Sequence, residues 1–239
     1  MPQLTIVRHG QASYGSDDYD KLSPLGACQG EVVGQWLATC GFQPARVVTG
    51  GLLRQRETAD HCLNALLASA DKASAPTPER LIDKALDEYD NERIVHVHVP
   101  HLNTPAAMRA HVATHADPVR ASREIFLAAI DRWVANESPS DYEETWPAFN
   151  QRCRQAFISA AEGLPDDAQV LVFTSGGVIS SLCHDLLGLA PKAAFELNWS
   201  LANAGITVVN ARKGKLRLAS LNSVGHLEQT RDRSLITYR

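Results

Sequence analysis

Residues 171–180 read LVFTSGGVIS, and this stretch decides how the chain is expected to fold. The apolar run from Leu171 to Phe173 predicts the end of a buried strand, and the apolar spacing that resumes at Val178 is typical of a helix. Two glycines lie between them. A strand that turns over glycines directly into a helix leaves unpaired backbone N–H groups around one point, and such a helix start favours an anion. The turn is therefore a candidate anion site.

Short strands and helices alternate on both sides of this turn. The pattern predicts strands over residues 3–7, 45–49, 80–86, 169–173, 205–210 and 215–221, and helices over residues 24–40, 52–70, 106–115, 119–134, 146–161 and 178–187. Such alternation implies a largely parallel sheet covered by helices on both faces. We therefore expect a single α/β domain over residues 1–239, built as a three-layer sandwich with a mostly parallel central sheet.

Residues 89–144 interrupt the alternation, because they are irregular, rich in histidine and punctuated by prolines. We expect this stretch to form an inserted cap at the carboxyl edge of the sheet. That edge is where doubly wound folds bind their ligands.

The composition limits the class of protein. Of the 239 residues, 44% are hydrophobic and 21% are charged, so the chain can bury a large core. The net charge of −4 gives no general attraction to nucleic acid or to an anionic membrane. We expect no signal peptide and no membrane span, because MPQLTIVRHG runs directly into a strand pattern and no apolar run is long enough. The five cysteines show no C-x-x-C spacing, so we expect reduced thiols and a cytoplasmic protein.

Polar side chains follow four of the predicted strands. They are Arg8 and His9 after the first strand, Arg54 and Arg56 after the second, Glu88 after the third, and the turn from Thr174 to Gly177 after the fourth. Guanidinium groups match phosphate oxygens in a bidentate manner, and neutral imidazole is a nucleophile toward phosphorus. Taken singly, each group also fits an ordinary structural role, such as a solvated helix face or a surface acidic run. Taken together, they indicate a phosphate site.

In combination these stretches resemble a known family. R-H-G-Q after an N-terminal strand, L-x-R-x-R-x-T-A at residues 52–59, L-x-E at residues 86–88 and strand-T-S-G-G-V-I occur in the order found in the histidine phosphatase superfamily, also called the phosphoglycerate mutase-like family. The resemblance implies that His9 is phosphorylated on a ring nitrogen and that Glu88 is the general acid. It further implies that the phosphoryl group is bound by Arg8, Arg54, Ser175 and Gly176, and that no metal or other cofactor is needed.

Two departures from the family pattern bear on the activity. The family carries a second histidine where this chain has Ser175, and loss of one such donor can cost about two to three orders of magnitude in rate. The serine hydroxyl can still donate a hydrogen bond. The mutases of the family continue R-H-G-x-S-x-W-N, whereas this chain reads RHGQASYG, which provides fewer phosphate contacts.

We therefore expect a phosphomonoester hydrolase that acts, without a metal, on a small phosphorylated substrate. One alternative is a catalytically degenerate relative that binds a phosphorylated ligand without turnover. Another is a phosphotransferase of the phosphoglycerate mutase type. The sequence names neither the substrate nor the oligomeric state.

Residues 96–101 read HVHVPH and raise the question of a metal. Read as a strand, the stretch places His96 and His98 on one face at a spacing compatible with Zn²⁺. No cysteine or acidic residue of matching spacing completes a ligand set, so we expect no metal. The alternative is that His96, His98 and His101 face the active site and help to receive an anionic substrate, or supply there the missing imidazole.

Overall fold

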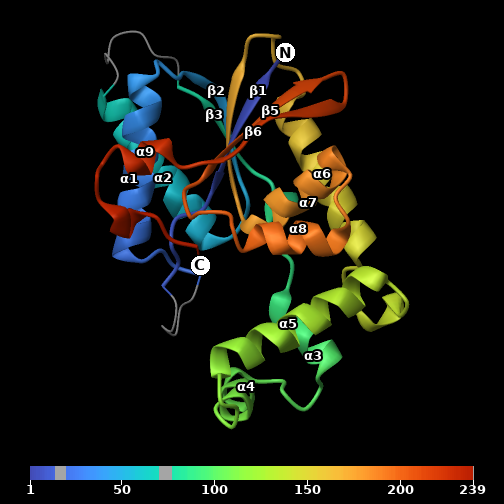
Figure 1. Ribbon diagram of the computed structural model, residues 1–239. Helices are drawn as coiled ribbons and strands as arrows, with labels where there is room; N and C mark the ends of the chain where they lie inside the picture. Colours follow the sequence, from blue (N-terminus) through green and yellow to red (C-terminus); the bar gives the residue numbers. More distant parts are fainter. Residues whose placement is uncertain (14–19, 70–76, 239) are drawn as a thin grey trace. The chain divides into compact units, whose positions relative to one another are not determined.

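The protein is described by a computed structural model that covers residues 1–13, 20–69 and 77–238. The chain divides into two compact units, the first formed by Met1–Glu88 and Arg152–Arg239 and the second by Tyr89–Gln151. The first unit contains a six-stranded sheet in the order β3-β2-β4-β1-β5-β6 (Figure 1). The strands are β1 (Gln3–Arg8), β2 (Pro44–Thr49), β3 (Glu79–Ile82), β4 (Gln169–Thr174), β5 (Ile206–Arg212) and β6 (Lys215–Ser223).

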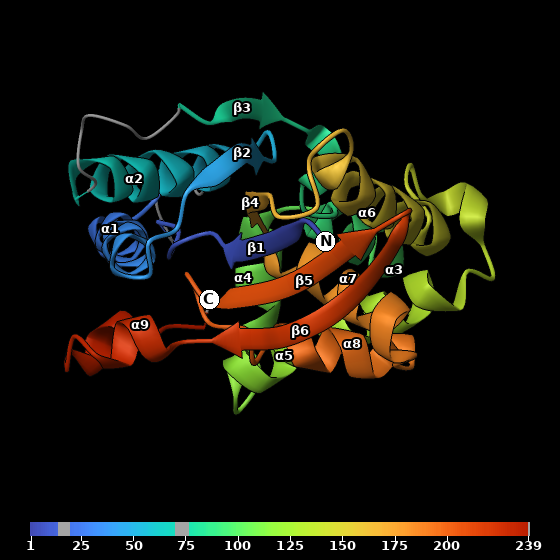
Figure 2. The same ribbon diagram turned by 90° about the horizontal axis from the view of Figure 1, so that it is seen from above.

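Strands β1, β2, β3 and β4 pair in parallel, whereas β5 and β6 are antiparallel. Figure 2 shows α1 and α2 on one face of the sheet and α6, α7 and α8 on the other. The helices of this unit are α1 (Pro24–Thr39), α2 (Leu53–Ser69), α7 (Gly176–Leu187), α8 (Pro191–Asn198) and α9 (Gly225–Glu228), and α6 (Trp146–Ala161) begins in the second unit. The mostly parallel α/β fold predicted from the sequence is confirmed, whereas α8 and α9 were not predicted.

The third strand is shorter than the predicted stretch of residues 80–86. β3 ends at Ile82, and a 3-10 helix, η1 (Lys84–Leu86), follows it directly. The Asp83 side chain caps this turn by accepting a hydrogen bond from the backbone N–H of Ala85 at 2.9 Å. The short polar side chain thus diverts the backbone out of the sheet.

The second unit is helical, with α3 (Asn91–His98), α4 (Pro105–Val112) and α5 (Pro118–Ala135). Its core is a cluster of aromatic rings with centroids 5.3–5.9 Å apart, formed by Tyr89, Trp133, Trp146 and Phe149. The indole N–H of Trp133 donates to the carbonyl oxygen of Glu144 at 2.8 Å, so the buried polar end of this ring is satisfied.

The interpretation of residues 96–101 as a strand is wrong. His96 and His98 lie in α3, which begins where the Asp90 side chain accepts from the N–H of Arg93 at 2.9 Å. In a helix, residues two apart point about 200° from each other, so these imidazoles do not share a face. Within the residues described, no group of three or more His, Cys, Asp or Glu could hold a metal ion.

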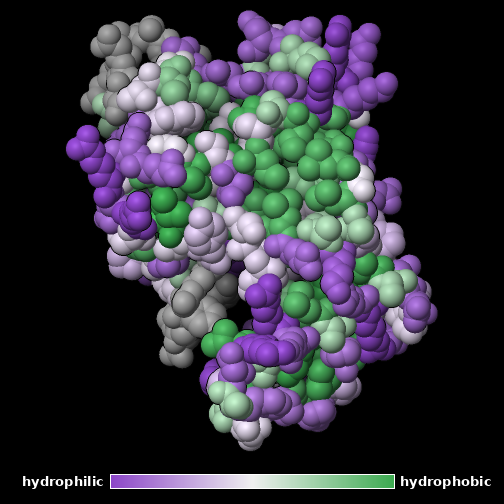
Figure 3. All heavy atoms as spheres, in the orientation of Figure 1, coloured by the Kyte–Doolittle hydropathy of each residue, from purple (hydrophilic) through white to green (hydrophobic). Residues whose placement is uncertain are grey.

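Apolar surface, green in Figure 3, gathers where β5, β6, α7 and α8 lie in Figure 1. Leu187 at the end of α7 and Trp199 after α8 are 50% and 43% exposed. β6 is one of the two edge strands, and its exposed Lys215 and Arg217 are of the kind that discourages edge-to-edge pairing. The five cysteines are free thiols, of which Cys28 and Cys40 are exposed and the other three are buried. Over the described ranges, no helix has the length and apolar character to cross a membrane.

Helices α1 and α2 approach each other through glycines spaced four apart on α1. A Cβ at Gly34 would lie 2.1 Å from the carbonyl oxygen of Cys62, and one at Gly30 would lie 3.1 Å from that of Thr58. No side chain fits at Gly34 unless the helices separate. The close contact fixes the position of α2, whose first turn belongs to the candidate site.

We predict that Gly34→Ala lowers the free energy of unfolding by about 1–3 kcal/mol, because overpacking forces the two helices apart. Urea unfolding followed by circular dichroism measures this. The matched control is Gly225→Ala, since a Cβ there meets no atom within 4 Å. Equal stability of the two variants would contradict the close packing.

A second buried feature lies between α9 and α1. His226 is 1% exposed, its ring centroid lies 5.9 Å from that of Trp36, and its Nε2 has no hydrogen-bond partner among the described residues. Burial lowers the pKa of His226 to about 4, against the opposing effect of its hydrogen bond to the backbone of Ala204. The imidazole is therefore neutral in the folded protein near pH 7.

We predict that His226 makes the protein less stable in acid. The unfolded chain binds a proton on this ring near pH 6.5, whereas the folded chain does so only near pH 4, so stability present above pH 6.5 is lost as the pH falls. The loss at pH 5 is about 2 kcal/mol. In His226→Phe, the fall in unfolding free energy between pH 7 and pH 5 should shrink by about this amount. The control His101→Gln changes an exposed histidine and should behave as wild type. If the fall in unfolding free energy is the same in His226→Phe as in wild type, the prediction is refuted.

Candidate active site

The parallel pairing of β1 with β4 places two sequence-predicted residues side by side. Arg8 is paired with Thr174, the last residue of each strand, so His9 and Ser175 emerge next to each other at the same edge of the sheet. The backbone N–H of His9 donates to the carbonyl oxygen of Thr174 at 2.9 Å, which holds the two chain segments together beyond the strand ends.

The His9 ring is held in one tautomer. It is 4% exposed, and its Nδ1 lies 2.7 Å from the carbonyl oxygen of Gly10, which can only accept a hydrogen bond. Nδ1 therefore carries the proton and Nε2 has a lone pair, toward which Arg54 Nε donates at 3.2 Å. Burial, then Arg54, then Arg8 lower the pKa of His9 well below its usual value, against a smaller opposing effect of Gly10. The ring is a neutral base, and its Nε2 lone pair can attack an electrophile once the hydrogen bond from Arg54 Nε is given up.

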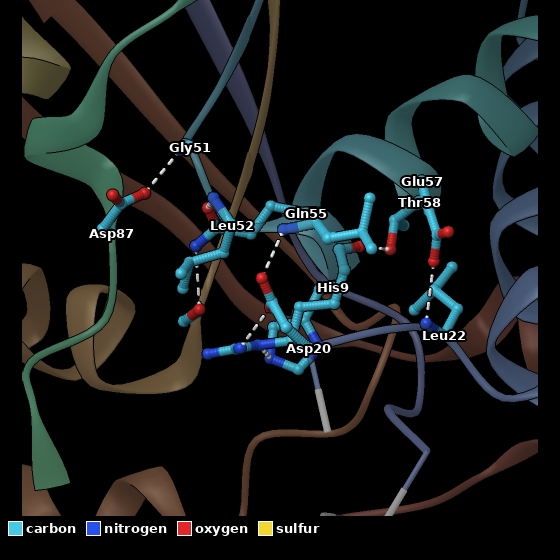
Figure 4. Close-up of polar contacts among 12 residues, drawn as sticks. His9, Asp20, Leu22, Gly51, Leu52, Gln55, Glu57, Thr58 and Asp87 are labelled. Atoms are coloured by element: carbon cyan, nitrogen blue, oxygen red, sulfur yellow. Dashed lines mark hydrogen bonds and ion pairs between the residues drawn. The ribbon is translucent and has the colours of Figure 1, made fainter. Parts of the chain in front are cut away.

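Arg54 belongs to the first turn of α2 and makes an ion pair within the site. Its Nη1 lies 2.6 Å from Asp20 Oδ1, and Asp20 Oδ2 accepts from the backbone N–H of Leu53 at 2.7 Å. One carboxylate thus caps the helix and neutralises the guanidinium. The labelled Asp20 lies close to His9 in Figure 4.

Thr58 ties the loop that carries His9 to α2. Its hydroxyl accepts from the N–H of Gly10 at 2.9 Å and donates to the carbonyl oxygen of Arg54 at 2.6 Å. Thr58 is fully buried, so both backbone groups are satisfied away from water. The threonine of the L-x-R-x-R-x-T-A stretch is therefore a structural link between nucleophile and guanidinium.

Ser175 is fully buried and accepts a hydrogen bond from Gln55 Nε2 at 2.8 Å. It is the N-cap residue of α7, but its side chain does not cap the helix. The N–H of Gly177 instead donates to Glu88 Oε2 at 3.0 Å, which brings this carboxylate to the helix start. A helix N-terminus favours such a negative charge.

The turn requires glycine at residue 176, where α7 begins, two residues earlier than predicted. A Cβ there would lie 2.1 Å from Asn198 Oδ1 and 3.3 Å from Arg8 Nε. Asn198, at the end of α8, thus reaches the site, and its Oδ1 is buried without a hydrogen-bond partner in the described part of the chain. Arg8 is 8% exposed, and its Nη1 donates to the carbonyl oxygen of Leu201.

Asp87, next to Glu88, is a structural acid. Its Oδ1 accepts from the N–H of Gly51 at 2.5 Å, and so fixes the turn that leads into α2 (Figure 4). Burial raises the pKa of Asp87, and its hydrogen bonds to the backbone of Gly51 and Leu52 oppose this shift. Arg152 Nη1 donates to the carbonyl oxygen of Asp87 at 2.8 Å and so holds the same segment.

The structure brings together the residues that the sequence singled out, namely Arg8, His9, Arg54, Glu88, Ser175 and Gly176, whereas Arg56 is exposed. The sequence reasoning missed Asp20, Gln55 and Asn198. Asp20 stands in a run of acids without a spacing signal, Gln55 reads as one more polar helix residue, and Asn198 comes from an unpredicted helix. The site contains two guanidiniums, a neutral imidazole, a carboxylate and a helix N-terminus, which suits a phosphoryl group.

Comparison with known proteins finds one family model that matches part of the chain and several solved structures of similar fold. The model of the histidine phosphatase superfamily (branch 1) matches residues 111–224, a stretch that contains Ser175 but neither His9 nor Arg54. No sequence match is found among curated proteins.

Three solved structures with a similar fold are a phosphoglycerate mutase from Bacillus anthracis, a mutant phosphoserine phosphatase from Entamoeba histolytica in complex with phosphoserine, and a mycobacterial glucosyl-3-phosphoglycerate phosphatase. Their identities to this chain are 16%, 17% and 21%, and their TM-scores are 0.63, 0.60 and 0.58. The alignments cover 96%, 95% and 92% of this chain and 96%, 100% and 98% of the respective structures. The chain thus matches the histidine phosphatase superfamily model over just under half of its length and has a fold similar to that of these phosphatases and this mutase.

Proposed function

We propose that the protein is a metal-independent phosphomonoester hydrolase that works through a phosphohistidine at His9. The observation that carries the proposal is the buried, neutral His9, whose Nε2 lone pair lies 3.2 Å from Arg54 Nε. A nucleophile with a fixed tautomer next to a guanidinium suits attack on a phosphate, because the charge of the phosphoryl oxygens is balanced at the position of transfer.

The first step transfers the phosphoryl group to the enzyme. His9 Nε2 forms a bond to phosphorus while the bond from phosphorus to the leaving oxygen breaks, and Glu88, whose protonated form is favoured by the negative charge of the bound phosphate, donates a proton to that oxygen. Arg8 and Arg54, the Ser175 hydroxyl and the backbone N–H of Gly176 bind the equatorial oxygens, where the transition-state charge is spread. Nδ1 remains protonated and hydrogen-bonded to Gly10, which stabilises the phosphorylated ring.

The second step hydrolyses the phosphoenzyme. Glu88, now ionised, accepts a proton from a water molecule that attacks phosphorus, and the bond from phosphorus to Nε2 breaks. Inorganic phosphate leaves, and both His9 and Glu88 return to their starting protonation states. A single carboxyl group thus acts first as acid and then as base.

The solved structures of similar fold support a small phosphate monoester as the substrate. Two are named as phosphatases, and one of these holds phosphoserine. Hydrolysis is favoured over mutase chemistry, because a mutase must keep its phosphoenzyme from water and this chain lacks the mutase serine, tryptophan and asparagine after R-H-G.

A second candidate function is binding of a phosphorylated ligand without turnover. It is favoured by Ser175, which stands where the family has a second histidine, and by the ion pair of Asp20 with Arg54. A phosphate would have to displace the Asp20 carboxylate from the guanidinium. Both candidates use the same site residues, so kinetics separates them.

We predict that His9→Ala lowers hydrolysis of p-nitrophenyl phosphate in the presence of EDTA by at least about three orders of magnitude, because the nucleophile is lost. Rapid quenching with radiolabelled substrate should trap an acid-labile phosphoenzyme in wild type and none in His9→Ala. His61→Ala, which removes a half-exposed imidazole from the same helix as Arg54, is the control and should keep wild-type turnover. Wild-type turnover no faster than that of His9→Ala, with phosphate still bound in calorimetry, would establish the binding protein instead.

We also predict that Glu88→Gln discriminates between leaving groups. A general acid contributes about 10²–10⁴ to the rate when the leaving oxygen needs a proton, and much less when it does not. Hydrolysis of an alkyl phosphate should therefore fall by about 100-fold or more, and hydrolysis of p-nitrophenyl phosphate much less. The comparison variant Asp87→Asn disturbs the neighbouring turn and should affect both substrates alike. An equal loss on both substrates in Glu88→Gln would remove Glu88 from the acid role.

A further inference from the structure

The orientation of the Gln55 amide is fixed by partners of known polarity. Gln55 is fully buried in the first turn of α2. Its Nε2 lies 3.1 Å from the carbonyl oxygen of Leu86, which can only accept, and its Oε1 lies 3.3 Å from the backbone nitrogen of Leu52, which can only donate. These contacts decide which end of the amide is nitrogen, a choice that needs such evidence. The hydrogen bond between Gln55 and Ser175 therefore has Gln55 as its donor.

The direction of this bond determines what the Ser175 hydroxyl can do. A hydroxyl has one proton to donate and two lone pairs that accept. One lone pair accepts from Gln55 at 2.8 Å, and no described residue accepts the proton, since the side chain makes no other hydrogen bond within the ranges covered. Ser175 is fully buried, so an unused donor there has a cost unless a ligand oxygen meets it. The hydroxyl is thus prepared to donate to an incoming oxygen atom.

The position of the hydroxyl agrees with the place of phosphoryl transfer. Ser175 and His9 follow the paired residues at the ends of β4 and β1, and Arg54, which donates toward His9 Nε2, precedes Gln55 in the chain. The Gln55–Ser175 pair therefore stands beside the nucleophile, on the side of the α7 N-terminus.

We propose that Gln55 is a positioning residue that holds the Ser175 hydroxyl as a hydrogen-bond donor toward the phosphoryl group. This inference rests on the proposed function and extends it to a residue outside the sequence motifs. The Gln55 amide and the Ser175 hydroxyl take the place of the second histidine of the family pattern. This part of the site therefore neither gains nor loses a proton near neutral pH. Gln55 acts only through Ser175, and that dependence makes the proposal testable.

A double-mutant cycle tests whether Gln55 acts through Ser175. Ser175→Ala should lower kcat for p-nitrophenyl phosphate by about 100-fold, since one donor to the transferring group is lost. Gln55→Leu should lower kcat by about tenfold in wild type, because the hydroxyl is no longer oriented, and should have no further effect in Ser175→Ala. The control is Gln29→Leu, which removes another fully buried amide bonded to Leu235 and should multiply with Ser175→Ala. A Gln55→Leu effect of equal size in both backgrounds would overturn the proposal.

Gln55→Glu reverses the hydrogen bond with little change in shape. A carboxylate can only accept, so it takes the Ser175 proton and withdraws the donor from the phosphoryl group. Activity relative to wild type should be low at neutral pH and should rise as the pH falls, because a protonated glutamic acid can again donate. A pH-independent ratio would indicate a packing role for Gln55. Circular dichroism and thermal unfolding establish that each variant is folded.

Binding of inorganic phosphate, measured by calorimetry, separates failure of this inference from failure of the proposed function. If turnover requires His9 but the effects of the Gln55 and Ser175 substitutions are independent, the inference is refuted and the hydrolase proposal stands. Phosphate binding that shows the same non-additivity without turnover supports the inference and refutes the hydrolase. A wild-type protein that neither turns over p-nitrophenyl phosphate nor binds phosphate refutes both.

Discussion

The parallel pairing of β1 with β4 is the constraint on which the rest of the site depends. It ends with Arg8 opposite Thr174, and so delivers two chain segments more than 160 residues apart to one point. Every other group is positioned relative to this pair. Thr58 attaches α2 to the loop after β1, and the carbonyl oxygen of Leu86 accepts from the Thr174 hydroxyl at 2.7 Å, which places Glu88 at the start of α7. A shift of register by one residue would turn the side chains of one strand to the other face relative to its partner and separate these contacts.

The sequence predicts the sheet and its edge well, because strands and helices differ in apolar period and because polar residues follow the strands. The two secondary-structure predictions that were wrong each have a physical cause. Alternating valine and histidine at residues 95–98 imitate a strand, but the Asp90 cap starts a helix, and the aromatic cluster of the second unit forms a core for that unit. Strand β3 ends earlier than predicted because the Asp83 side chain accepts a hydrogen bond from the backbone N–H of Ala85.

For the site, the sequence identifies the residues that come directly from strand ends and motifs. It does not identify the residues that reach the site only through tertiary contacts. Gln55 is one helix residue among several polar neighbours until the fold brings it to Ser175, and the same is true of Asp20 and Arg54. Spacing along the chain carries no information on these contacts, because their geometry depends on how closely α1, α2 and the sheet pack. The glycines of α1 are a sequence trace of that closeness.

Asp20 links the stability of α2 to the charge of the candidate site. One carboxylate oxygen serves the stability of α2 through Leu53, and the other limits the charge that Arg54 offers to a ligand. An asparagine at this position would keep the helix cap with its amide oxygen while it releases the guanidinium, and aspartate and asparagine codons differ by one base. In the proposed hydrolase, a stronger anion site is thus a single mutational step away at little structural cost. There the acid at residue 20 would weaken the binding of the product phosphate and so favour its release.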